Sequence, residues 1–138
     1  MPTSLIALGL AVGLIAPPPV PDLTLTDTTG KPRSVRPSEA KPVVLLLLSV
    51  DCLVANRYAL PFPVLLDPTQ ELARAARVTR VPTTVVLSPA GVVLYHWRVD
   101  DRNIGTRKAR AEPTRRDLAE AVAETLAGKR PAVPRTPV

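Results

Sequence analysis

The stretch Val43–Tyr58, VVLLLLSVDCLVANRY, decides the fold expected for this chain. Its first six residues, Val43–Leu48, are apolar without a break, and a short run bounded by Pro42 and Ser49 is typical of a strand buried on both faces. The only cysteine of the chain, Cys52, follows soon after that strand. Open α/β sheets carry their working groups outside the carboxyl ends of the strands, so Cys52 is the first candidate for a functional residue.

The chemistry of Cys52 depends on its surroundings. If Leu53–Tyr58 begins a helix, the thiol lies at the helix N-terminus, where unsatisfied N–H groups and the helix dipole favour a thiolate. Nearby Arg57 or Arg80 would lower the pKa of the thiol further, whereas the adjacent Asp51 would raise it. Two alternatives follow for Cys52: a reactive redox thiol, or a buried, inert cysteine that behaves as a small hydrophobe.

Composition excludes several classes of site. A chain of 138 residues suits one domain with a real core. One cysteine and one histidine exclude an intrachain disulfide, a CxxC pair and most Cys- or His-based metal sites, so neither a cofactor nor a metal is implied. Residues 102–138 hold nine basic and four acidic side chains, which account for +5 of the net charge of +6. No aromatic platform accompanies this charge, so a solvated surface is favoured over nucleic acid or anionic lipid as a partner.

The two ends of the chain differ from its middle. Ser4–Ala16 is apolar but shorter than the roughly 20 residues of a membrane span, and it fits the core of a secretory signal. We expect a signal peptide or apolar N-terminal segment over 1–20, one domain over 21–128 and a loose Pro/Arg-rich tail over 129–138. Export to the periplasm or the cell exterior is expected; a cytoplasmic protein whose apolar N-terminus packs on the domain is the alternative.

Periodicity and turn residues predict the remaining elements. They are a hairpin over 23–36, a helix over 52–59, a short buried strand over 62–66, a helix over 67–77, an antiparallel strand pair over 84–99 and a helix over 114–128. Alternation in the second strand of that pair puts His96 opposite Tyr95 and Trp97, at the surface. Strands that alternate with helices imply an α/β fold with a mixed sheet.

Three segments in this order resemble the thioredoxin-like superfamily and, within it, the redoxin branch (peroxiredoxin-like, or AhpC-TSA). They are SVDCLVANRY at 49–58, FPVLLDPTQELARAARV at 62–78 and VPTTVVLSPAGVVLYHWRVDDR at 81–102. In the first segment, five residues match the branch's Asp-Cys-Pro-x-x-Asn-Arg-Tyr pattern: Asp51, Cys52, Asn56, Arg57 and Tyr58. Leu53 stands where proline is usual. The likeness covers roughly residues 20–130.

The chain also departs from that family. Only about a dozen residues join the buried strand to Phe62, near the minimum for a parallel crossover, so a central βα unit is reduced or missing. Either Phe62–Leu66 takes its place in the sheet, or the sheet has a gap. Ala55 replaces the second cysteine of thioredoxins, Leu45 a proline of peroxiredoxins, and Val81 their arginine.

The resemblance implies a thioredoxin-like three-layer sandwich, in which helices flank a mixed sheet. It implies a thiol-dependent oxidoreductase or antioxidant whose site residues are Cys52, Ser49, Arg57 and Pro82, the last as the family's cis-proline. Peroxide is a candidate substrate. Without a resolving cysteine, an external thiol or a protein thiol must reduce the oxidised Cys52. The alternative is a non-catalytic thioredoxin-fold module that binds a partner, with an inert cysteine. The oligomeric state is left open.

Overall fold

The computed structural model describes residues 16–36, 40–51, 60–105 and 108–137. The strands are β1 (Thr24–Asp27), β2 (Pro32–Ser34), β3 (Val43–Leu47), β4 (Leu65–Leu66), β5 (Thr83–Leu87), β6 (Val93–Trp97), β7 (Asn103–Gly105) and β8 (Lys108–Ala109). The helices are α2 (Glu71–Ala75) and α3 (Asp117–Leu126).

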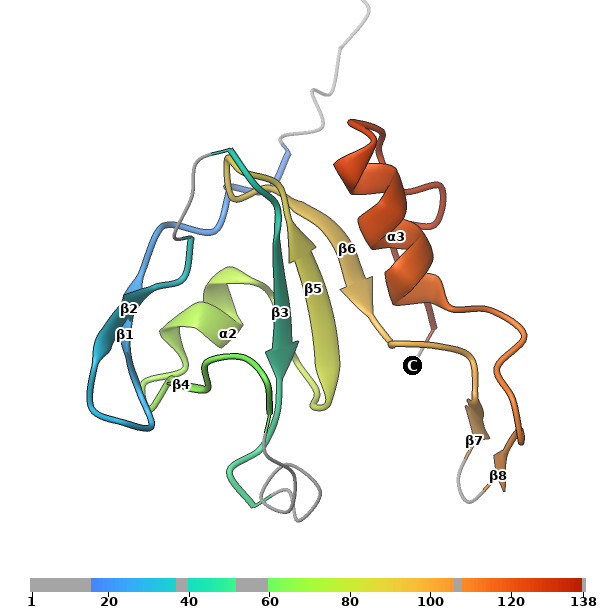
Figure 1. Cartoon of the computed structure of the whole chain (residues 1–138), viewed down its shortest axis with the longest axis horizontal. Coiled ribbons are helices and arrows are strands. Elements are labelled where there is room, and N and C mark those ends of the chain that lie inside the picture. Colours follow the sequence, from blue (N-terminus) through green and yellow to red (C-terminus); the bar gives the residue numbers. More distant parts are fainter. Residues whose placement is uncertain (1–15, 37–39, 52–59, 106–107, 138) are drawn as a thin grey trace, which may run out of the picture.

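The strands form two small antiparallel sheets, in the orders β2-β1-β4 and β3-β5-β6, and a separate β7-β8 ribbon (Figure 1). Every strand pair within them is antiparallel. The described residues are therefore mostly β, with two helices of which one is short. The expected α/β three-layer sandwich with a mixed sheet is wrong. β3 pairs with the distant β5, and β4 pairs with β1 of the other sheet instead of with β3.

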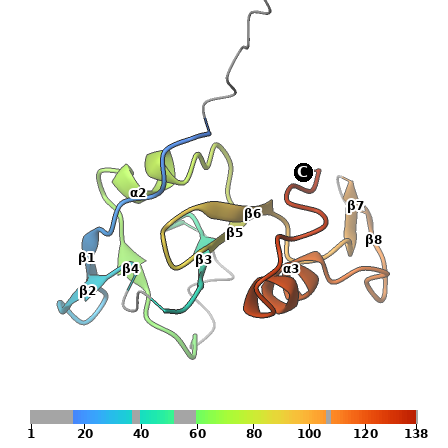
Figure 2. The same ribbon diagram turned by 90° about the horizontal axis from the view of Figure 1, so that it is seen from above.

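A gap separates the two sheets. Leu66 pairs with Thr26 and Leu65 with Asp27, so β4 extends the N-terminal hairpin instead of joining β3. The β2-β1-β4 sheet lies to one side of β3, and the edges of β3 and β4 face each other (Figure 2). We had expected that Phe62–Leu66 either joins the sheet or leaves a gap in it, and the structure has the gap.

The first core joins the inner faces of both sheets to α2. Its buried residues are Val20, Val35, Leu72, Ala76, Val85 and Leu87, and Leu45 of β3 and Leu65 of β4 pack against them. On the outer face of β3, Val44 is 47% exposed and Leu46 is 39% exposed. The prediction that this strand is buried on both faces is therefore wrong, because no described element covers its outer side.

The second core lies under α3. Ala121 packs with Val86 of β5 and Tyr95 of β6, and Leu118 and Val122 join them. This confirms the amphipathic last helix. Its start differs from the prediction, because the Thr114 N–H donates to the Asp101 carboxylate at 2.7 Å, and the helix begins at Asp117 instead.

The C-terminal segment is not loose, contrary to expectation. Thr136 is 4% exposed, and Arg135 forms a parallel bridge with His96 of β6. The edge of a strand supplies the hydrogen bonds that order this segment, a signal that its composition does not carry. Within the described part of the chain, no helix is long and apolar enough to cross a membrane.

Candidate functional site

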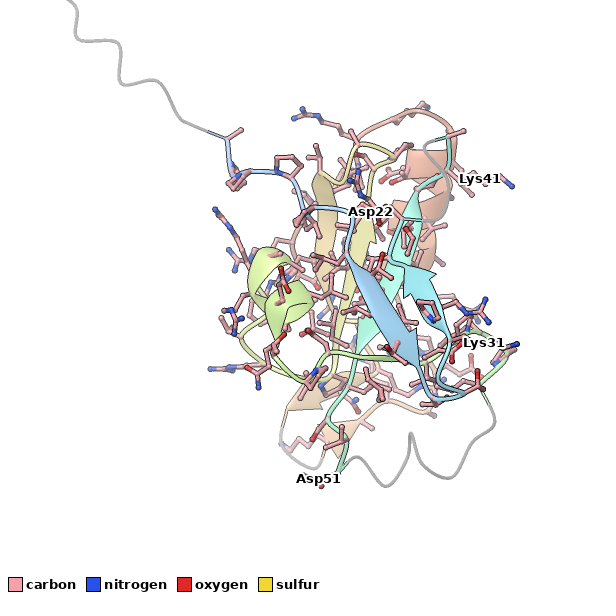
Figure 3. The ribbon with its side chains drawn as sticks, turned by 90° about the vertical axis from the view of Figure 1, so that its left-hand side faces the viewer. Asp22, Lys31, Lys41 and Asp51 are labelled. Atoms are coloured by element: carbon pink, nitrogen blue, oxygen red, sulfur yellow. The ribbon has the colours of Figure 1, made fainter. Side chains whose placement is uncertain are left out.

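The candidate site lies where β3 ends and β5 begins. Leu47 pairs with Thr83 in the antiparallel register, so Pro82 lies beside the exit of β3, five residues before Cys52. The Val81–Pro82 peptide bond is cis, as the resemblance implied. Asp51 lies beyond the end of β3 at this edge (Figure 3).

Two of the four expected site residues are described. Ser49 is exposed, and its hydroxyl accepts the N–H of Asp51 at 3.3 Å in a local turn. Pro82 is also exposed. Both lie at the same end of the β3-β5-β6 sheet. Cys52 and Arg57 lie outside the described residues.

Thr83, which the sequence did not single out, stabilises the turn at this end of the sheet. Thr83 is buried, and its hydroxyl donates to the carbonyl of Arg80 at 2.7 Å. This bond fixes the turn that carries Arg80 and Pro82, both of which are exposed. The only feature of the sequence that could have indicated this hydrogen bond is a hydroxyl-bearing residue directly after proline. The turn therefore presents a cation at the same edge as the exit of β3.

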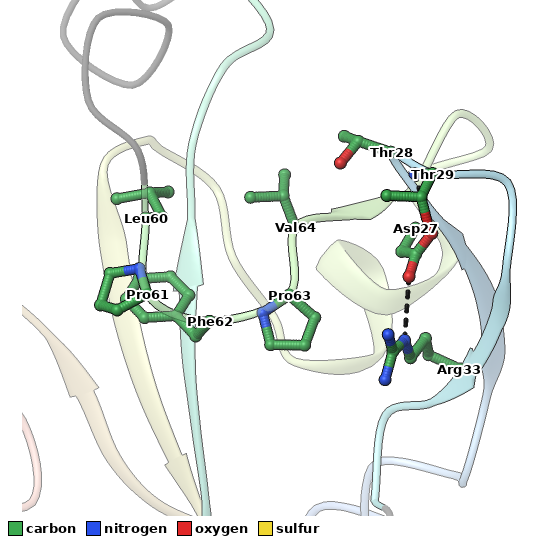
Figure 4. A pocket seen from close by; sticks show the side chains of 9 residues that line it. All are labelled: Asp27, Thr28, Thr29, Arg33, Leu60, Pro61, Phe62, Pro63 and Val64. Carbon is green, nitrogen blue, oxygen red and sulfur yellow. Dashed lines mark hydrogen bonds and ion pairs between the residues drawn. The ribbon is translucent and has the colours of Figure 1, made fainter.

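A cavity of about 550 Å³ lies between the β1–β2 turn and the segment that precedes β4 (Figure 4). Its lining residues are Asp27, Thr28, Thr29, Arg33, Leu60, Pro61, Phe62, Pro63 and Val64. Of the buried strand expected over 62–66, only Leu65 and Leu66 form a strand, and the expected burial is wrong, because Phe62 is 48% and Leu66 45% exposed. The apolar wall of the cavity is formed by Leu60, Pro61, Phe62, Pro63 and Val64.

Asp27 is the acidic group of this cavity, and its carboxylate is already occupied. It accepts the Thr29 hydroxyl at 2.6 Å, the Thr29 and Lys31 N–H groups at 2.8 and 3.0 Å, and the Arg33 Nε at 2.9 Å. These bonds, with that of the Thr29 hydroxyl the strongest, hold the pKa of Asp27 well below its usual range. Asp27 is therefore an ionised structural residue and does not serve as a general acid.

His96 is buried, with 8% of its surface exposed, so the prediction of a surface position is wrong. His96 pairs with Val85 of the first core and Tyr95 with Val86 of the second, so the two side chains lie on opposite faces as predicted, but the face that carries His96 is covered as well. The ring of Trp97, whose φ is +124°, meets His96 edge-on at 5.2 Å. Burial lowers the pKa of His96, the Arg135 charge lowers it further, and a hydrogen bond with the backbone of Ala76 opposes both. Among the described residues, no group of three or more His, Cys, Asp or Glu could hold a metal ion.

Comparison with known proteins shows which structures this fold resembles and indicates no activity. No protein-family model and no curated protein sequence matches the chain. An uncharacterized conserved protein from Geobacillus kaustophilus superposes with a TM-score of 0.67 at 17% identity, over 88% of this chain and 87% of that one. A hypothetical protein from Sinorhizobium meliloti 1021 gives a TM-score of 0.70 at 18% identity, over 88% and 90%. The chain is similar in fold to these two proteins, and identities this low carry no activity across.

Proposed function

We propose that the chain is a thiol-dependent oxidoreductase or antioxidant that acts through Cys52. The observation that carries the proposal is the Leu47–Thr83 register, because it puts the Arg80–Thr83 turn beside the chain that leads to Cys52. An exposed arginine at this edge favours a thiolate. The likeness of the segment around Cys52 to the redoxin branch supports the same chemistry at the level of sequence.

The proposed reaction has two stages. The Cys52 thiolate attacks one oxygen of a hydroperoxide; an S–O bond forms, the O–O bond breaks, and the leaving oxygen takes a proton, giving a sulfenic acid and an alcohol or water. The chain has no second cysteine, so an external thiol attacks the sulfenic sulfur and water leaves. A second external thiol then attacks the mixed disulfide, which releases an external disulfide and restores Cys52.

The test is the alkylation rate of Cys52 against pH on the folded chain, before and after one equivalent of hydrogen peroxide. We expect a rate that saturates well below the free-thiol pKa of about 8.5 and that is lost after peroxide. Arg80→Ala should shift the saturation to higher pH. Arg74→Ala, the loss of another exposed arginine, should leave the profile unchanged. A thiol that reacts only when the chain is unfolded would overturn the proposal.

A second candidate is a partner-binding module with an inert cysteine. The observation that favours it is a set of exposed apolar side chains near the gap between the sheets: Val44, Leu46, Phe62, Val64 and Leu66. Exposed apolar clusters are typical of interaction surfaces. The alkylation experiment separates the two candidates, because a binding module needs neither a depressed thiol pKa nor sensitivity to peroxide.

We also propose that the chain is exported under the direction of its apolar N-terminus. Val20 is fully buried in the first core, and its N–H donates to the carbonyl of Gly91 at 2.8 Å. Removal of the leader should therefore leave Val20 in place. The test is cell fractionation of a C-terminally tagged chain with N-terminal sequencing: a mature start between residues 16 and 20 outside the cytoplasm is expected, and an intact cytoplasmic chain would contradict export.

A further inference from the structure

The outer edge of β6 is occupied by the chain's own C-terminal segment, residues 131–137. The N–H of His96 donates to the carbonyl of Pro134 at 3.1 Å, and the N–H of Thr136 donates to the carbonyl of His96 at 3.4 Å. Arg135 and His96 form a parallel bridge. Figure 1 places the C-terminus near the end of β6. The segment thus pairs with β6 through a single parallel bridge and two backbone hydrogen bonds, which an extended peptide could also make.

A buried pocket receives the Thr136 side chain. The Tyr95 hydroxyl donates to the carbonyl of Arg98 at 2.7 Å, so its oxygen is left to accept from Thr136, 3.2 Å away. The Thr136 hydroxyl in turn accepts the N–H of Arg98 at 3.3 Å. The Arg98 guanidinium is held by Asp117 of α3 at 2.7 Å. Because the Thr136 hydroxyl bonds both the Tyr95 hydroxyl and the Arg98 N–H, a residue without a hydroxyl would leave the buried N–H unpaired.

The neighbouring position selects a different side chain. The guanidinium carbon of Arg135 lies 5.2 Å from the centre of the Trp97 ring, over its face. An aromatic face favours a cation, and a flat guanidinium best of all. Two successive positions therefore have separate recognition elements, an aromatic face for Arg and a polar pocket for Thr.

The segment lies outside both hydrophobic cores, although Pro131 and Thr136 within it are buried. Residues 126–130, which connect it to α3, are all exposed. Neither hydrophobic core contains a residue of 131–137. The Ala132 N–H donates to the Glu124 carboxylate of α3 at 2.8 Å. The segment could therefore leave β6 without taking a residue of either core with it.

We propose that the edge of β6 is a binding site for an extended peptide of a partner protein that carries an Arg-Thr pair, and that residues 131–137 occupy this site as an internal ligand. The two backbone hydrogen bonds to His96 supply orientation, and the Trp97 face and the Thr136 pocket supply the choice of sequence. A partner peptide binds when the internal segment leaves. The site is separate from Cys52 and does not depend on the proposed redox function.

The test uses the full chain and a peptide with the sequence of residues 131–138. The variant Arg135→Ala/Thr136→Val loosens the internal segment and leaves the β6 edge intact. Trp97 is the only tryptophan of the chain, so its fluorescence reports the binding directly. We expect the variant to bind the peptide roughly tenfold or more tightly than the wild type, which must first displace its own segment. Arg130→Ala, the loss of an exposed arginine just outside the segment, should behave as the wild type.

The peptide itself provides the specificity control. A peptide with Ala and Val in place of Arg and Thr should bind the loosened variant roughly tenfold more weakly, because it lacks the cation and the hydroxyl. Equal binding of both peptides, or no binding of either to the folded variant, would overturn the proposal. If the double variant does not fold, a protease site inserted after Gly128 allows the internal segment of folded protein to be cut. Exchange of the cut segment for labelled peptide then supports the proposal, and its retention refutes it.

Discussion

Replacing Tyr95 with phenylalanine should lower the free energy of unfolding by about 2 kcal/mol, since it deletes two hydrogen bonds and nothing else. The ring is fully buried in the second core and would keep its packing against Val86 and Ala121. Its hydroxyl bonds the Arg98 carbonyl at 2.7 Å and Thr136 at 3.2 Å. Each bond is worth about 1 kcal/mol net, and more where a buried partner is left unpaired.

The assay is urea denaturation followed by far-ultraviolet circular dichroism. A loss of about 2 kcal/mol corresponds to a drop in melting temperature of roughly 6 °C for a chain of this size. Thr24→Val is the matched control, because it removes an exposed hydroxyl and should change the stability by less than about 0.5 kcal/mol. Unchanged stability in Tyr95→Phe would refute the reasoning.

A double-mutant cycle tests the connection to the C-terminal segment. Thr136→Val removes the other hydroxyl of the pair. If the two hydroxyls bond each other, the double variant should be less destabilised than the sum of the single variants, by about 0.5–1 kcal/mol. Strict additivity would show that the two side chains do not interact, and the Thr136 pocket would then be wrongly described.

Three further predictions concern the turns and the titrating groups. Gly91→Ala should cost at least about 2 kcal/mol in urea denaturation, because its φ is +83° and a Cβ would overlap the Val20 carbonyl, whereas Gly30→Ala, with φ +84° and open space, should cost about 1 kcal/mol. The folded-state pKa of His96 lies below its ordinary value of 6.5, so the free energy of unfolding should fall as pH drops below 6.5. The variant His96→Gln should lack this dependence. An unchanged pH profile in that variant would contradict the burial of His96. Hydrogen bonds from the Thr114 hydroxyl and, next in effect, the Arg115 N–H hold the pKa of Asp101 at about 2. The stability that ionised Asp101 contributes is therefore complete above pH 3.8 and is lost as pH falls from 3.8 to 2. NMR titration of the carboxyl should show the low pKa, and a value near 3.8 would contradict these hydrogen bonds.

Local signals in the sequence predicted the elements that depend on near neighbours. The N-terminal hairpin, the β5–β6 pair and the amphipathic α3 are confirmed. The helix expected over 67–77 begins at Glu71, and the Asp67 carboxylate accepts the N–H groups of Glu71 and Ala73 at 2.9 and 3.0 Å. In each case a turn residue or a capping carboxylate acts within a few positions of its partner.

Contacts between distant segments were not predictable in this way. Composition identified β3 as a strand, but its pairing with β5 and the pairing of β4 with β1 depend on residues far apart in the chain. The burial of His96 depends on distant segments, because its partner Val85 belongs to the first core and Arg135 of the C-terminal segment forms a bridge with it. At the candidate site, the resemblance indicated Pro82 and its cis peptide bond, whereas nothing in the sequence predicted the hydrogen bond from Thr83 to the Arg80 carbonyl.

The gap between the sheets has a consequence for the handling of the protein. Within the described chain, the edge of β3 that faces β4 pairs with no strand, and this strand is VVLLL with apolar side chains on both faces. Short, uncharged, β-prone segments on an open edge are templates for intermolecular stacking into cross-β aggregates. Lys41 and Asp51 flank the segment as charged gatekeepers, but neither lies within it. We therefore expect amyloid-like self-association through Val43–Leu47 when the protein is concentrated.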